Sequence, residues 1–230
     1  MNCPNKFWSI GSVCVATLLA AQSSNGELVF DNSTGDLLTR FNPTTYEVGD
    51  EIILAGGART MTNFVFQYYG ENFSGDEFAQ VRFYVNDGGA DPSGAIRPGT
   101  LFFDSGPFSI IATPRNTLQF DLVQLTTGNI LNLAPGFVLP NSFTWTVQFS
   151  GITGTETAGV DLYNPPTTGW DYNSYWDNDP FNGGWLLKTN GSLAMNFGAR
   201  IEAVPEPNAI ALGLGGALLV ILFRAGLRRK

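Results

Sequence analysis

The residues SFTWTVQFS, positions 142–150, alternate strictly between polar and apolar side chains. Successive side chains of a β-strand point to opposite faces, so Phe143, Trp145, Val147 and Phe149 would share one face of an extended chain. The polar residues between them would occupy the other face. This pattern predicts a strand with one side buried in a core.

Other parts of the chain repeat this pattern and extend the prediction to a whole domain. Comparable alternation occurs in three further segments, 64–68, 79–85 and 193–201. Shorter apolar segments predict strands near 28–30, 51–54, 101–103, 118–125 and 159–163. Turn signals rich in Gly and Asn separate them at 86–89, 182–184 and 190–192.

These elements favour one all-β domain over 22–203, since no long 3.6-residue apolar period precedes Ala209. About nine or ten short strands predict a single antiparallel β-sandwich, jelly-roll-like, with 192–202 as its final strand.

Composition removes several classes of function. The chain has 230 residues, with 20 acidic and 12 basic side chains and no histidine. Without histidine there is no imidazole base, no imidazole metal ligand and no Ser-His or Cys-His nucleophile. The excess of acidic residues disfavours nucleic acid as a partner.

The N-terminus has the three parts of a secretory signal peptide over 1–21. Lys6 provides the positive charge, 10–20 provide the apolar stretch, and small residues precede a cleavage point before Gln22. Both cysteines, Cys3 and Cys14, lie inside this segment. The mature domain would therefore contain neither a disulfide nor a thiol.

The C-terminal 204–230 segment also has three parts. Pro205 and Pro207 favour an extended spacer, because each fixes its own φ and restricts the residue before it. The uncharged 209–223 segment predicts a transmembrane helix of about 22 Å, shorter than the ~30 Å hydrocarbon core. A basic tail follows and would stay cytoplasmic, which places the domain across the membrane.

Together, Val204-Pro205-Glu206-Pro207, the short helix and the terminal Arg228, Arg229 and Lys230 resemble the PEP-CTERM sorting signal of Gram-negative bacteria. The resemblance implies export by the secretion machinery and recognition of these residues by an exosortase, a membrane protease-transpeptidase. It implies a transient anchor in the inner membrane with the domain on the periplasmic side. Cleavage near Pro-Glu-Pro would then deliver the domain to the cell surface or beyond, often where exopolysaccharide is made. A permanent membrane anchor is the alternative.

A segment over 165–185, expected to be a loop, combines aromatic rings with amide and carboxylate groups. Rings stack on the C–H faces of sugars while polar groups bind hydroxyls, so this mixture suits a glycan site. The candidate glycan-binding residues are Trp170, Tyr172, Tyr175, Trp176 and Trp185. The alternative is that the rings cap one end of the sandwich.

The same segment offers hard oxygen ligands for calcium, the one cofactor the sequence suggests. The candidate ligands are Asp171, Asn173, Asp177 and Asp179. Asn86, Asp87 and Asp91 form a second candidate group. Asx turns explain Asp and Asn in loops equally well.

These observations rank three functions. The first is a non-enzymatic structural protein of the cell surface or extracellular matrix. The second is a carbohydrate-binding module that uses 170–185, with exopolysaccharide as a partner. The third is a polysaccharide hydrolase, although no pair of carboxylates is marked in the sequence as catalytic.

Overall fold

The computed structural model describes residues 26–43, 47–121, 138–181 and 183–205. Within these ranges every regular element is a β-strand, and none of the described residues forms a helix that could cross a membrane. The predicted signal peptide and the predicted 209–223 helix lie outside the described residues.

The first sheet has six strands. They are β1 (Glu27–Asn32), β2 (Asp36–Phe41), β4 (Thr60–Glu71), β8 (Thr113–Asp121), β10 (Thr157–Tyr163) and β14 (Ala199–Val204). The long β4 pairs with β8 along one edge, and with β14 and then β10 along the other. β1 and β2 complete the sheet outside β14 and β10.

The second sheet has eight strands. They are β3 (Glu47–Ile53), β5 (Phe78–Tyr84), β6 (Leu101–Asp104), β7 (Phe108–Ser109), β9 (Ser142–Ser150), β11 (Trp170–Asp171), β12 (Tyr175–Asp179) and β13 (Gly184–Lys188). The main order is β13-β12-β3-β9-β5-β6, with β11 also on β3 and β7 also on β5. All the pairings are antiparallel.

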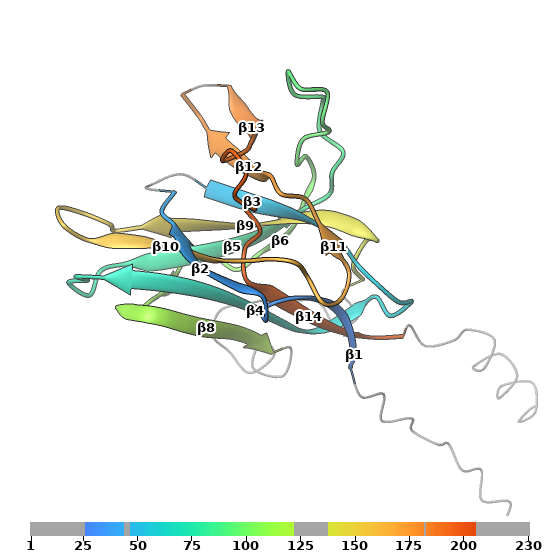
Figure 1. Ribbon diagram of the computed structural model, residues 1–230, viewed down its shortest axis with the longest axis horizontal. Coiled ribbons are helices and arrows are strands. Elements are labelled where there is room, and N and C mark those ends of the chain that lie inside the picture. Colours follow the sequence, from blue (N-terminus) through green and yellow to red (C-terminus); the bar gives the residue numbers. More distant parts are fainter. Residues whose placement is uncertain (1–25, 44–46, 122–137, 182, 206–230) are drawn as a thin grey trace, which may run out of the picture.

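The core lies between the two sheets, which form two layers in Figure 1. Phe64 of β4 packs edge-on against Phe83 of β5 and Trp145 of β9, with ring centroids 5.0 and 5.4 Å apart. Tyr68 and Phe149 form a similar contact at 6.4 Å. The predicted all-β fold with two antiparallel sheets is confirmed, and the jelly-roll order of the strands stays a prediction.

The predicted strand over 142–150 is confirmed residue for residue as β9. The predicted final strand over 192–202 is wrong in its first half, because β14 begins only at Ala199. Residues 194–198 are buried on all sides, including the polar Asn196, so their alternation does not reflect one buried and one solvated face. This segment lies between β13 of one sheet and β14 of the other.

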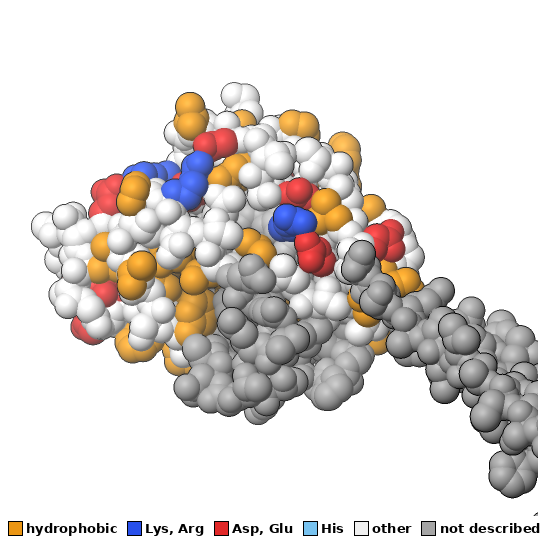
Figure 2. Space-filling model, turned by 90° about the horizontal axis from the view of Figure 1, so that it is seen from below, with side chains coloured by type: hydrophobic (Ala, Val, Ile, Leu, Met, Phe, Trp, Pro, Cys, Tyr) orange, Lys and Arg blue, Asp and Glu red, His pale blue; other side chains and the backbone are white. Residues whose placement is uncertain are grey.

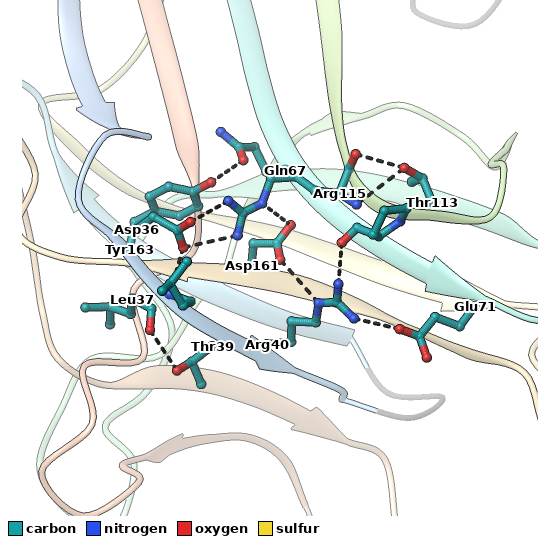
Figure 3. Close-up of polar contacts among 12 residues, drawn as sticks. Asp36, Leu37, Thr39, Arg40, Gln67, Glu71, Thr113, Arg115, Asp161 and Tyr163 are labelled. Carbon is teal, nitrogen blue, oxygen red and sulfur yellow. Dashed lines mark hydrogen bonds and ion pairs between the residues drawn. The ribbon is translucent and has the colours of Figure 1, made fainter.

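A polar network spans the outer face of the first sheet (Figure 3). At its centre, the completely buried Asp161 of β10 lies 3.3 Å from Arg115 Nε and 3.9 Å from Arg40 Nε. Arg115 also binds Asp36 of β2 through two hydrogen bonds, and Arg40 binds Glu71 of β4. The network thereby links β8, β4, β10 and β2.

The aromatic rings around Asp161 complete its enclosure. The Arg40 guanidinium lies 4.8 Å from the Tyr69 ring centroid, and the Arg115 guanidinium lies 5.3 Å from that of Tyr163. Such cation–π contacts add to the ion pairs. On the face shown in Figure 2, the visible basic side chains each lie beside acidic ones, so no large basic patch forms there.

Candidate functional site

The candidate site begins with the loop that joins β5 to β6. Its backbone is closed by hydrogen bonds from Val85 N to Thr100 O and from Gly88 N to Arg97 O, of 2.9 and 3.0 Å. The side chain of Asp91 accepts hydrogen bonds from the backbone N–H groups of Ser93, Ala95 and Leu187. Because Leu187 belongs to β13, this carboxylate fastens the loop to the β12–β13 hairpin, as the adjacent green and orange segments of Figure 1 illustrate.

A pocket of about 380 Å³ lies between this loop and the second sheet. Its lining residues come from four parts of the chain: Glu51, Gly94, Ala95, Ile96, Tyr172, Ser174 and Leu187. Glu51 supplies a carboxylate, Ser174 supplies a hydroxyl, and Tyr172 supplies an aromatic ring. This is the combination of apolar wall and few polar groups that small-molecule sites use.

Glu51 lies on the outer face of β3, between inward-facing Asp50 and Ile52. Its partial burial raises the pKa of its carboxyl above the ordinary value, while the side chains of Trp176, Asn86 and Ser142 oppose that shift. Those neighbours favour the ionised form by hydrogen bonding. Glu51 is therefore a positioned hydrogen-bond acceptor for hydroxyl groups in the pocket.

Two of the five predicted glycan-binding rings are available to a ligand. Trp170 and Tyr172 are 61% and 44% exposed. Trp170 pairs with Ile53, and Tyr172 follows two residues later and lines the pocket with Glu51. In an extended chain the Cα atoms of two such residues are about 6–7 Å apart and their side chains project from the same face. Tyr172 lines the pocket, and Trp170 extends this exposed aromatic edge along β11, outside the pocket lining.

The other three rings are used within the protein. Tyr175 faces the core, with its ring centroid 4.8 Å from that of Phe41. Trp176 is completely buried. Trp185 packs edge-on against Tyr84 at 5.5 Å. The predicted loop over 165–185 is partly strand, since it contains β11, β12 and the start of β13.

The four predicted calcium ligands do not form one group. Asp177 pairs with Lys188, and Asp179 accepts a hydrogen bond from Phe181 N at 2.9 Å. Asp171 instead points inward and accepts a hydrogen bond of 2.7 Å from Asn196 Nδ2. The same nitrogen lies 3.5 Å from Asn173 Oδ1, so these two residues do share a site. Burial raises the pKa of Asp171 to about 7.

In the second predicted calcium group, Asp87 and Asp91 serve as turn residues. Asp87 accepts hydrogen bonds from the backbone N–H and the hydroxyl of Thr100, at 2.6 and 2.7 Å. Asp91 closes the loop as described above. Another acidic group is formed by Asp76, Glu77 and Glu156. Its carboxylates also accept hydrogen bonds from the backbone of neighbouring loop residues: Glu77 from Ser74 N and Gly75 N, and Glu156 from Thr153 N.

Of the predicted sorting residues, Val204 ends β14 and Pro205 is exposed directly after it. The others, Glu206, Pro207, Arg228, Arg229 and Lys230, lie outside the described residues. The structure therefore leaves the sorting signal as a prediction.

Sequence reasoning missed Glu51, the 94–96 wall and the buried Asp50. Asp50 was detectable, because it occupies the inward position between Val48 and Ile52 in an alternating segment. An acidic residue at a core position indicates a buried polar site. Burial and the charge of Asp171 raise the pKa of Asp50 well above its ordinary value. Nothing in the sequence indicated that residues 94–96 line a pocket, since the sequence of a glycine-rich loop rarely indicates which part of the fold it covers.

Comparison of the chain with protein-family models, with curated proteins and with solved structures gave no match. The features of the chain that bear on its function are therefore the pocket and the terminal sequences.

Proposed function

We propose that this chain is an exported surface or matrix protein whose β-domain binds carbohydrate in the pocket beside β11. The observation that carries the proposal is the exposed ring of Tyr172, which lines the pocket with the Glu51 carboxylate, extended along β11 by the exposed ring of Trp170. Exposed rings stack against sugar C–H faces, and a carboxylate accepts hydrogen bonds from sugar hydroxyls. The expected partner is a polysaccharide of the cell's own surroundings.

Binding is favoured over hydrolysis by the acidic groups available. Of the described residues that line the pocket, Glu51 is the one acidic side chain. Glycoside hydrolysis generally uses two carboxyl groups across the scissile bond. A pocket with a single carboxylate therefore suits recognition better than cleavage.

The first experiment measures binding of the purified full chain to a panel of soluble polysaccharides by affinity electrophoresis or calorimetry. Trp170→Ala and Tyr172→Ala are each expected to lower the affinity for the best ligand about fivefold or more, since an aromatic anchor buried by the ligand contributes more than about 1 kcal/mol. Phe181→Ala is the matched control, because Phe181 is 85% exposed but neither lines the pocket nor belongs to β11 beside it.

Two results would count against the carbohydrate site. Equal affinity in all three variants would move the binding surface away from β11. No detectable affinity for any polysaccharide would return the domain to a purely structural role.

The proposed route of export rests on the terminal sequences. The PEP-CTERM resemblance assigns 204–207 and the basic tail to recognition by an exosortase-type protease-transpeptidase. Replacing Pro205, Glu206 and Pro207 together by alanine is expected to retain most of the protein in the inner membrane. Cell fractionation with mass spectrometry of the C-terminus measures this outcome. An intact Arg228-Arg229-Lys230 end on surface-located parent protein would contradict processing and favour a permanent anchor.

A further inference from the structure

Two carboxyl groups face each other inside the sandwich. Asp50 lies on the inner face of β3 and is completely buried. Asp171 of β11 is 4% exposed and pairs with Ile52, which puts it on the same face of the sheet, diagonal to Asp50. None of the ion pairs within the described ranges involves either residue. Two buried carboxyls therefore share this space without a basic partner.

Two adjacent residues of the 194–198 segment donate hydrogen bonds to Asp50 and Asp171. Phe197 N donates a hydrogen bond of 2.9 Å to Asp50 Oδ2, and Asn196 Nδ2 donates one of 2.7 Å to Asp171 Oδ1. The same amide nitrogen lies 3.1 Å from Asn164 Oδ1 and 3.5 Å from Asn173 Oδ1. Oxygen atoms from three side chains thus converge on one point.

Three further oxygens of this cluster have no hydrogen-bond partner among the described residues: Asp50 Oδ1, Asp171 Oδ2 and Asn196 Oδ1. Each belongs to a buried side chain. A buried polar atom without a partner costs on the order of 1–3 kcal/mol, more when it is charged, so native proteins rarely retain three together. Such unpartnered oxygens identify a place where a ligand completes the structure.

The chemistry of the donors selects the ligand. All the available atoms are carboxylate or amide oxygens, and the chain contains no histidine, which disfavours zinc and copper. Calcium takes six to eight oxygen ligands in flexible geometry and accepts both carboxylates and amide carbonyls. Two carboxylates also balance its charge of +2.

We infer that a calcium ion binds inside the sandwich between Asp50, Asp171 and Asn196, with Asn164 and Asn173 completing the site toward the surface. In the ion-bound state the Asn196 amide turns by 180°, an exchange of N and O that leaves the side chain's shape unchanged, and its oxygen takes the position that Nδ2 now holds among Asp171, Asn164 and Asn173. The exposed Asn173 marks the path by which the ion enters. The ion joins β3, β11, the 164–165 connection and the 196–197 segment.

The test uses the purified full chain, treated with EGTA and then dialysed into metal-free buffer. Calorimetry with CaCl₂ is expected to give about one Ca²⁺ per chain. At a hundredfold excess over the Kd, the melting temperature is expected to rise by roughly 5–10 °C, as ligand linkage requires. MgCl₂ at the same concentration is expected to give a smaller rise, because Mg²⁺ demands stricter octahedral geometry.

The decisive variant is the double substitution Asp50→Asn with Asp171→Asn. It keeps side-chain shape and the acceptor for Phe197 N, but removes both charges. Without metal it is expected to melt at or above the temperature of the metal-free parent, because two like, buried charges are gone. With CaCl₂ its melting temperature should not move. Glu156→Gln, in the separate acidic group, should respond to calcium like the parent.

Each outcome decides the matter. A parent chain that neither binds calcium nor gains thermal stability from it overturns the site, and protons then neutralise the two acids. A double variant that still responds, or a Glu156→Gln variant that no longer does, places the ion elsewhere and also overturns it. Because the readouts are metal binding and melting, failure of carbohydrate binding would not affect them.

Discussion

Replacing Trp176 by alanine is expected to lower the free energy of unfolding by about 3–5 kcal/mol, the range for removing a large buried aromatic side chain. Trp176 is completely buried and sits on β12, paired with Gly49 on one side and Leu187 on the other. Its indole lies on the outer face of the second sheet, beside Glu51. The lost ring would leave a cavity that strands on both sides cannot close.

Urea denaturation followed by tryptophan fluorescence measures this change, and thermal melting should fall by roughly 10 °C for a domain of this size. Trp170→Ala is the matched control, since the same side chain at 61% exposure should change stability by less than about 0.5 kcal/mol. If both variants melted at the parent's temperature, Trp176 would not be part of a packed interior. The comparison separates a ring that supports the pocket from a ring that contacts the ligand.

Replacing Arg40 and Arg115 together by methionine is expected to cost about 3–5 kcal/mol, because Asp161 would remain buried without a compensating charge. Within the described residues neither carboxylate oxygen of Asp161 has a hydrogen-bond donor, so the two guanidinium groups are what balances its charge. Methionine keeps much of the apolar stem of each arginine. Urea denaturation again measures the loss.

The matched rescue is Asp161→Asn in the same double-methionine background. Removing the buried charge should restore most of the lost stability, since a neutral side chain needs no ion pair. Hydrogen bonding from Arg115 also lowers the pKa of Asp36, which should return toward its ordinary value when Arg115 is replaced. A triple variant no more stable than the double one would mean that the arginines act through packing on Tyr69 and Tyr163 instead.

The sequence predicts this fold well wherever one face of a strand is apolar. β9 could be predicted to the residue because Trp145 and its apolar neighbours alternate with polar residues. β2 could not, because its apolar residues do not alternate: Leu37 and Leu38 are consecutive, and Leu37 packs against the core while Leu38 is 87% exposed. The 194–198 segment misleads for the opposite reason: it is buried on every side and holds Asn196 inside.

The segment that carries the candidate site could be predicted from the sequence, but not which of its side chains are exposed or which distant residues join them. Aromatic residues at 170–185 pointed to the edge of the sheet that carries the candidate pocket, yet composition does not distinguish Trp170, which is exposed, from Trp176, which is buried. Strand pairing decides that difference, since Trp176 lies between two neighbouring strands. Asp171 was likewise identified as a candidate ligand, whereas Asp50 and Asn196 are 25 or more residues away in sequence and join it only in the fold.

The register of β1 against β14 places Glu27 opposite Ala203, so the chain enters and leaves the described domain at the same end of the first sheet. β14 is also hydrogen-bonded on both sides, to β1 and to β4. A pull on the chain beyond Val204, along the strand, would shear both ladders at once, because their hydrogen bonds run across the strands. They could not be unzipped one bond at a time. A force applied to the chain beyond Val204 would therefore act on the domain at a mechanically resistant point.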